Sequence, residues 1–138
     1  MKKLLFSLYK KVIKLFYGSN LSKYDIVRKT SGYMKNQLHP EFVEIEGNKI
    51  YLDENDSLFL SSSILHEQTI VNLVKNEIKK GDVVIDIGAH IGYYTVLFAK
   101  LVGPKGRVFA FEASPTNFEI LKKNVNVNGY QNVTLNNK

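Results

Sequence analysis

The stretch VVIDIGAHIGYYT, residues 83–95, decides the fold of this chain of 138 residues. Its first five residues are mostly β-branched and predict a buried strand with Asp86 near its end. Gly88 and Gly92 interrupt the strand, and an apolar run at helical spacing follows over residues 93–102. A strand, a glycine turn and a helix in this order form a cradle for a nucleotide, because glycine lets a ligand approach the backbone and the helix start presents free N–H groups.

A second strand that ends in an acid follows the predicted helix. Residues 107–111 (RVFAF) read as this strand, and Glu112 comes directly after it. A carboxylate at the tip of the second strand of a βαβ unit is placed to accept hydrogen bonds from the two hydroxyls of an adenosine ribose. The dinucleotide fingerprint Gly-x-Gly-x-x-Gly fails, because His90 and Tyr93 stand at its second and third glycine positions. These residues therefore favour an adenosine cofactor other than a nicotinamide dinucleotide.

The cofactor loop resembles that of a known family. Residues 86–93 (DIGAHIGY) look like the first motif of the FkbM-type family of class I S-adenosylmethionine-dependent methyltransferases, where a polar residue, usually Asn, stands at the position of His90. Residues 111–115 (FEASP) are similar to the family's Phe-Glu-Pro-x-Pro, with Ala113 in place of the first proline. The family's Phe-x-x-Leu-x-x-Asn-x-x-x-Asn segment is matched by Phe118, Leu121, Asn124 and Asn128.

With Asp56-Ser57 and His66-Glu67, which are similar to earlier family motifs, the resemblance covers about residues 41–138. Trm5-like RNA methyltransferase domains share the Asn-x-x-x-Asn helix but usually carry Asp-x-Asn-Pro where residues 112–115 stand. The resemblance implies an α/β, Rossmann-like class I methyltransferase fold. Residues 1–40 are expected to form a basic amphipathic helix and linker before it.

The sequence predicts a β-hairpin and one more helix ahead of the glycine loop. Residues 42–46 and 49–52 alternate apolar and polar around a Gly47-Asn48 turn. A helix is expected over residues 67–79, with its inward face formed by Ile70, Val71, Val74 and Ile78.

The family's strand order, 3-2-1-4-5-7-6, places a fourth strand beside residues 83–87, and this sequence ends near the third strand. We therefore expect a domain truncated after strand three, from an incomplete or split reading frame. Residues 83–87 are then an exposed apolar edge, which a second polypeptide would complete.

The resemblance assigns S-adenosylmethionine to a set of loop residues: Asp86, Gly88, Ala89, His90, Gly92, Glu112 and Ala113. In this assignment Asp86 orients the methionine end and Glu112 holds the ribose, while His90 contacts cofactor without transferring a proton. The plainer alternatives are that Asp86 and the glycines only stabilise the turn. No catalytic residue is identified, because in the family a base for the acceptor normally follows the missing fourth strand.

Charge is concentrated at the N-terminus. Residues 1–30 hold eight Lys or Arg and one acid, whereas residues 31–138 have a net charge of −1. The globular part is therefore not expected to offer a broad nucleic-acid face. Residues 1–17 form a basic amphipathic helix that either lies on an anionic membrane surface or packs on the domain, so the expected location is cytoplasmic, with peripheral membrane contact as the alternative. The chain has no cysteine and only scattered histidines, so no metal site is expected.

The leading interpretation is an S-adenosylmethionine-dependent methyltransferase that modifies an oxygen of a small molecule or glycan. One alternative is an RNA or protein methyltransferase of the same fold. The other is a non-catalytic cofactor-binding or interaction remnant.

Overall fold

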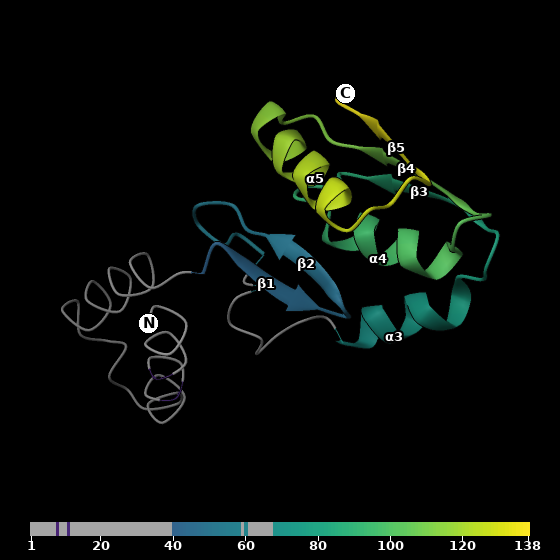
Figure 1. The fold of residues 1–138 in the computed structure, drawn as a ribbon, viewed down its shortest axis with the longest axis horizontal. Coiled ribbons are helices and arrows are strands. Elements are labelled where there is room, and N and C mark those ends of the chain that lie inside the picture. The colour runs from purple at the N-terminus through teal and green to yellow at the C-terminus, as the bar shows by residue number, and fades with distance from the viewer. Residues whose placement is uncertain (1–7, 9–10, 12–39, 59, 61–67) are drawn as a thin grey trace.

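The computed structural model describes Leu8, Lys11, residues 40–58, Leu60 and residues 68–138 (Figure 1). Its strands and helices are β1 (Phe42–Ile45), β2 (Asn48–Tyr51), α3 (Gln68–Glu77), β3 (Val83–Ile87), α4 (Tyr93–Val102), β4 (Arg107–Phe111), α5 (Pro115–Val127) and β5 (Val133–Asn136). The helix predicted over residues 1–17 and the motif residues His66-Glu67 lie outside the described part, Leu8 and Lys11 excepted. No helix in the described part is both long and apolar enough to cross a membrane.

The hairpin β1–β2 forms as predicted, but its turn lies one residue earlier. Ile45 pairs with Asn48, so the turn residues are Glu46 and Gly47, with φ of 53° and 75°. Two positive φ values are those of a type I′ turn, which matches the twist of the flanking strands. Asn48 belongs to β2 because it is buried and its Oδ1 accepts a 2.6 Å hydrogen bond from the Tyr130 hydroxyl. The prediction of a Gly47-Asn48 turn was therefore wrong.

A three-stranded parallel sheet in the order β3-β4-β5 carries the glycine loop. In Figure 1, α4 and α5 lie on the same side of this sheet. Val108 and Ala110 of β4 face these helices and are fully buried. Ala110 packs in one cluster with Val96 of α4 and Leu121 of α5. Val108 packs in a second cluster with Ala99 and Val102 of α4. The predicted α/β fold with its first three strands is thus confirmed for the described residues.

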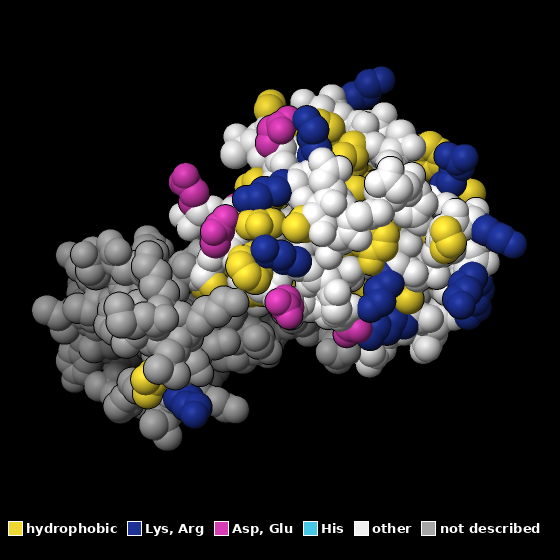
Figure 2. Space-filling view, viewed as in Figure 1, with side chains coloured by type: hydrophobic (Ala, Val, Ile, Leu, Met, Phe, Trp, Pro, Cys, Tyr) yellow, Lys and Arg dark blue, Asp and Glu magenta, His cyan; other side chains and the backbone are white. Residues whose placement is uncertain are grey.

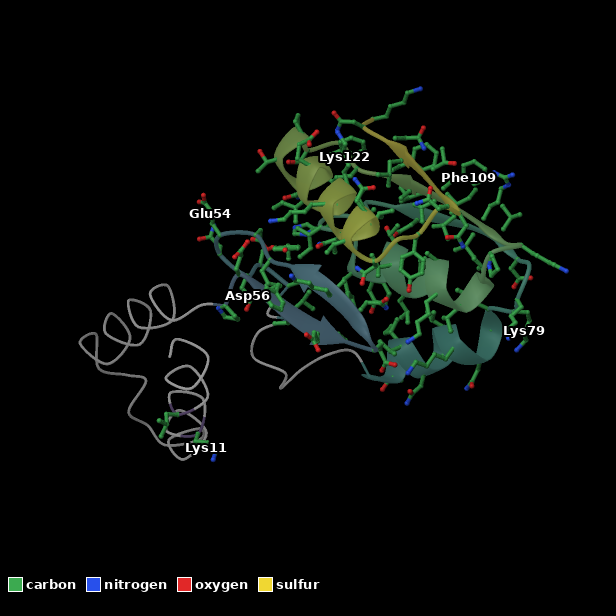
Figure 3. The ribbon with its side chains drawn as sticks, in the orientation of Figure 1. Lys11, Glu54, Asp56, Lys79, Phe109 and Lys122 are labelled. Atoms are coloured by element: carbon green, nitrogen blue, oxygen red, sulfur yellow. The ribbon has the colours of Figure 1, made fainter. Side chains whose placement is uncertain are left out.

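The opposite face of β3 is uncovered by any described element. Val83, Ile85 and Ile87 are 65%, 62% and 84% exposed. In register, Ile85 lies beside Phe109 and Ile87 beside Phe111 of β4, and Figure 3 shows Phe109 on the side of the sheet away from α5. The prediction that residues 83–87 are a buried strand was wrong on this face, because the described helices cover only the other one. The expected exposed apolar strand is present.

Helix α3 is shorter than predicted and packs along a narrower stripe. Val71 is buried, and Val74 and Ile78 are partly buried against the core. Ile70 was predicted to face inward but is 43% exposed. Val71, Val74 and Ile78 are spaced at i, i+3 and i+7 and form one stripe along the helix that contacts the core. Ile70 lies beside this stripe and stays exposed.

Asn124 of α5 and Asn128, the residue that caps α5 at its C-terminal end, fasten the hairpin to the domain. Asn124, which is fully buried, accepts from Tyr51 N–H at 2.7 Å and donates to the carbonyls of Tyr51 and Ile91 at 3.0 and 2.7 Å. Asn128 accepts from Lys49 N–H at 2.9 Å and donates back to the Lys49 carbonyl at 2.8 Å. Each side-chain amide therefore pairs with β2 as a neighbouring strand would. Through Ile91, Asn124 also holds the glycine loop.

Candidate functional site

The carboxyl ends of β3 and β4 bring the predicted site residues together. Asp86 pairs in register with Ala110, and Ile87 with Phe111. Glu112 therefore follows β4 at the level where Gly88 follows β3. Ligands of open parallel sheets bind outside this edge of the strands.

The loop that follows β3 is held mainly by its own backbone. The N–H groups of Gly88 and Ala89 both donate to the carbonyl of Phe111 at 2.9 Å, and Gly92 N–H donates to the carbonyl of Ala89 at 2.8 Å. Gly88, His90 and Gly92 all have positive φ, at 75°, 53° and 87°. Glycine adopts this conformation freely. For His90 the positive φ costs conformational energy, and strained residues of this kind cluster at functional sites.

The two glycines of the loop have different surroundings. A Cβ atom at Gly88 would meet nothing within 4 Å, so the backbone there borders open space. A Cβ at Gly92 would stand 2.5 Å from Cδ1 of Leu121 in α5. Gly88 therefore leaves room for a ligand, while Gly92 lets the loop pack against α5. The sequence predicted that the backbone at both Gly88 and Gly92 would lie close to the ligand.

Glu112 joins the two loops at this edge of the sheet. Its side chain is 8% exposed, and Oε2 accepts from His90 N–H at 2.8 Å. Its Oε1 accepts from Ser114 N–H, also at 2.8 Å. Each carboxylate oxygen retains a second lone pair. Ala113, the other predicted site residue here, is exposed beside Glu112, and its carbonyl accepts from the Asn137 side chain at 3.2 Å.

Asp86 is half-buried and close to a second negative charge. Its Oδ2 accepts a 2.5 Å hydrogen bond from the Thr95 hydroxyl of α4. Burial raises the pKa of Asp86, the Thr95 hydrogen bond opposes that rise, and the charge of Glu112 adds to it. Among the described residues neither carboxylate forms an ion pair. The site therefore favours a ligand that brings positive charge.

His90 connects the glycine loop to the turn after the hairpin. Its Nε2 lies 3.3 Å from the Ser57 hydroxyl, and Ser57 N–H donates to the Asp53 carboxylate at 3.1 Å. Its Nδ1 is buried and has no hydrogen-bond partner among the described residues. The sequence named Ser57 only as part of a motif and did not predict its contact with His90. The contact of Thr95 with Asp86 was not predictable either, because only the path of the chain into α4 brings that hydroxyl close to a residue nine positions earlier. In the described part, no three His, Asp or Glu side chains cluster as a metal site.

Curated relatives of this chain differ in what they modify. Protein-L-isoaspartate O-methyltransferase of Ignicoccus hospitalis is 37% identical over 59 residues, which are 43% of this chain and 28% of that protein. The tRNA(Phe) (4-demethylwyosine(37)-C(7)) aminocarboxypropyltransferase of Methanocaldococcus jannaschii is 36% identical over 73 residues, or 53% and 28%. The 31-O-demethyl-FK506 methyltransferase FkbM of Streptomyces tacrolimicus is 48% identical over 48 residues, or 35% and 18%. The chain thus spans less than a third of the length of each.

A solved structure and a family profile extend over more of the chain. The crystal structure of M. jannaschii TYW2 in complex with AdoMet has a TM-score of 0.53 and 26% sequence identity, over 68% of this chain and 41% of that one. The profile of the TRM5/TYW2 methyltransferase domain matches residues 42–137. The predicted membership of the class I methyltransferases is therefore confirmed. The similarity to FkbM covers only 48 residues. The chain belongs to the TRM5/TYW2 methyltransferase domain family.

Proposed function

We propose that this chain supplies the S-adenosylmethionine-binding part of a class I methyltransferase. The observation that carries the proposal is the position of Glu112, whose buried carboxylate lies at the carboxyl edge of a parallel sheet, hydrogen-bonded to the loop in which Gly88 borders open space. This edge is where nucleotide ligands of such sheets bind.

The residues present fit this cofactor. The remaining lone pairs of Glu112 can accept from the ribose hydroxyls, as the sequence predicted. Asp86 and Glu112 place two carboxylates, with no ion-pair partner among the described residues, near a ligand that carries a sulfonium and an ammonium group. Bound S-adenosylmethionine supplies a methyl group that is already activated by its sulfonium.

The glycine loop contributes shape more than hydrogen bonds. The N–H groups of Gly88, Ala89, His90 and Gly92 all have internal acceptors. The methionine carboxylate would then meet the start of α4, which is the positive end of the helix dipole. His90 remains a proposed cofactor contact, because its buried Nδ1 lacks a partner among the described residues.

For the acceptor, our leading proposal is an oxygen of a small molecule or glycan. It rests on the similarity of residues 86–93 to the FkbM motif and on the 48% identity to FkbM. The alternative of an RNA or protein acceptor rests on the TRM5/TYW2 profile and on the isoaspartate and tRNA relatives. The further alternative, a non-catalytic cofactor-binding remnant, rests on the small share of each relative that this chain spans.

The ribose contact can be tested apart from general effects of mutation. We would measure by calorimetry the affinity for S-adenosylhomocysteine and for its analogue without the ribose 2′-hydroxyl, with the wild-type chain and with Glu112→Ala. The wild type should bind the analogue more weakly, since a hydrogen bond contributes about 0.5–1.5 kcal/mol net and more to a charged group. Glu112→Ala should bind both ligands equally. The same ratio of affinities in both proteins would remove Glu112 from the ribose site.

A further inference from the structure

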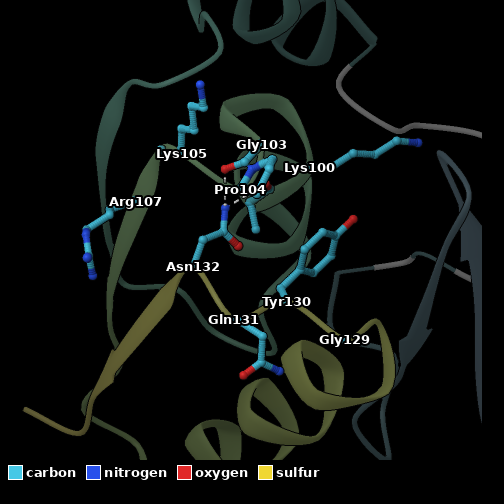
Figure 4. A pocket seen from close by; sticks show the side chains of 11 residues that line it. Lys100, Gly103, Pro104, Lys105, Arg107, Gly129, Tyr130, Gln131 and Asn132 are labelled. Carbon is cyan, nitrogen blue, oxygen red and sulfur yellow. Dashed lines mark hydrogen bonds between the residues drawn. The ribbon is translucent and has the colours of Figure 1, made fainter.

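A hollow lies at the end of the sheet opposite to the proposed cofactor site. It has a volume of about 440 Å³ and is lined by the last turn of α4, the start of β4 and the loop before β5. Figure 4 shows Lys105 and Arg107 on one side of it and Lys100 and Tyr130 on the other. Because β4 runs from Arg107 to Phe111, the hollow and Glu112 are separated by about 17 Å, at roughly 3.3 Å per strand residue.

The charge of the hollow is positive. Its lining includes Lys100, Lys105 and Arg107 and no acid. Lys100 donates to the carbonyl of Glu46, and neither Lys105 nor Arg107 forms an ion pair with a described residue. In Figure 2, Lys and Arg side chains gather at the right-hand end of the molecule, where α4 ends and β4 begins. The long flexible stems of lysine and arginine let their charged ends reach a ligand in the hollow.

The negative end of the α4 dipole also points here, and its carbonyls would repel an anion unless they were satisfied. Three carbonyls at this end of the helix accept hydrogen bonds from the chain itself. The Asn132 side chain donates to the carbonyls of Ala99 and Gly103 at 3.0 and 2.9 Å, and Gly81 N–H donates to the carbonyl of Val102 at 2.8 Å. With these carbonyls paired, the lysine and arginine side chains of the lining give the hollow its positive charge.

We propose that this hollow binds a phosphate group, carried by an RNA strand or by a free phosphate compound, with Lys105 and Arg107 as its charged ligands. Guanidinium and ammonium groups are the side chains that recognise phosphate, and arginine does so through two parallel hydrogen bonds. The slight negative charge of residues 31–138 disfavours a broad nucleic-acid face, whereas a single phosphate needs only this local cluster. An RNA strand that contacts both ends of the sheet would be anchored here while its modified base lies near the cofactor site.

The test uses the full chain and a matched pair of double variants. Lys105→Gln with Arg107→Gln removes two positive charges from the hollow. Lys122→Gln with Lys123→Gln removes two from α5, where both lysines are exposed and pair with Glu119 and Glu41. The probes are a fluorescent single-stranded RNA twelve nucleotides long, followed by anisotropy across a salt series, and inorganic phosphate as its competitor.

We expect the hollow variant to bind the RNA at least tenfold more weakly than the α5 variant at low salt. The slope of log affinity against log salt should fall by about 0.7, because one phosphate contact contributes roughly that amount for a single strand. If the hollow variant instead weakens only the binding of inorganic phosphate, the proposal holds with a free phosphate compound as ligand. Equal losses in the two variants for both probes would overturn it. Binding of S-adenosylhomocysteine should be unchanged in the hollow variant, so the outcome is independent of the proposed cofactor site.

Discussion

The backbone N–H of His90 donates to the Glu112 carboxylate at 2.8 Å, and this contact joins the loop after β3 to the end of β4. The second oxygen of Glu112 accepts from Ser114 N–H at the same distance. Both acceptor positions toward the protein are thus filled by N–H donors. Glu112 therefore shapes the loop before any ligand binds, and its remaining lone pairs are the ones that we propose to hold the ribose.

This arrangement predicts that Glu112→Gln is not a conservative change. The amide of glutamine has one oxygen and one NH₂ group, so a donor must face either His90 N–H or Ser114 N–H. We expect a loss of about 1–3 kcal/mol in the free energy of unfolding, the cost of leaving a buried donor unsatisfied. Urea unfolding followed by circular dichroism measures it, with the exposed Glu119→Gln as control. A variant as stable as the wild type would show that these two hydrogen bonds contribute nothing.

The two loop glycines should respond differently to alanine. Gly92→Ala combines positive φ with a Cβ 2.5 Å from Leu121 Cδ1, so α5 or its leucine must move. We expect a loss of roughly 2–4 kcal/mol in unfolding free energy, from overpacking and backbone strain together. Gly88→Ala carries the strain alone and should lose about 1–2 kcal/mol. Thermal and urea unfolding of both variants give the comparison, and equal losses would contradict the distinct surroundings of the two positions.

The parts of the fold that the sequence predicted are those fixed by local chemistry. Ser114 caps α5, accepting from Asn117 N–H at 3.4 Å, and Pro115 occupies the first helical position, as the Ser-Pro pair indicates. The order of β3, the glycine loop, α4 and β4 likewise follows from residue pattern alone. The hairpin turn was misplaced because the decisive contact, between Asn48 and Tyr130, joins residues far apart in the sequence.

Within the site, residue types were predictable and their partners were not. The sequence predicted Asp86, Gly88, Gly92 and Glu112 as cofactor-binding residues, and this stays a prediction. It did not predict that Gly92 lies close to Leu121 of α5. The burial of residues 83–87 was overestimated for a similar reason. A run of β-branched residues predicts a strand, but whether both of its faces are covered depends on helices elsewhere in the chain or beyond it.

Asp86 should make stability depend on pH. Its pKa is raised in the folded protein, mainly by burial, so the folded state holds a proton more tightly than the unfolded state does. The carboxyl therefore stabilises the fold most at low pH, below the ordinary value of 3.8, and this contribution is lost as pH rises through the folded pKa. Asp86→Asn keeps an acceptor for Thr95 without the charge. The variant should gain stability relative to wild type at pH 7 and gain less at pH 4.

Unfolding titrations of wild type and Asp86→Asn at the two pH values provide the measurement. Glu54→Gln, at an exposed turn, is the control for loss of one carboxylate. A stability difference that does not change with pH would show that Asp86 carries no buried charge at neutral pH.

The uncovered face of β3 should drive association. Val83, Ile85 and Ile87 expose large apolar side chains in a row, next to a strand edge that has β4 as its one partner among the described residues. Such a surface self-associates in water. We propose that a second polypeptide bearing an apolar strand and helix covers it, and that the 138-residue chain alone self-associates and does not transfer methyl groups.

Ile85→Lys should lower the apparent mass measured by analytical ultracentrifugation. The control Val127→Lys, at a 43% exposed position on α5, should not, because it leaves the sheet face unchanged. Co-expression with a polypeptide that carries such a strand and helix should restore the monomeric unit first and turnover second. A wild-type chain that stays monomeric at high concentration and methylates an acceptor unaided would contradict the prediction.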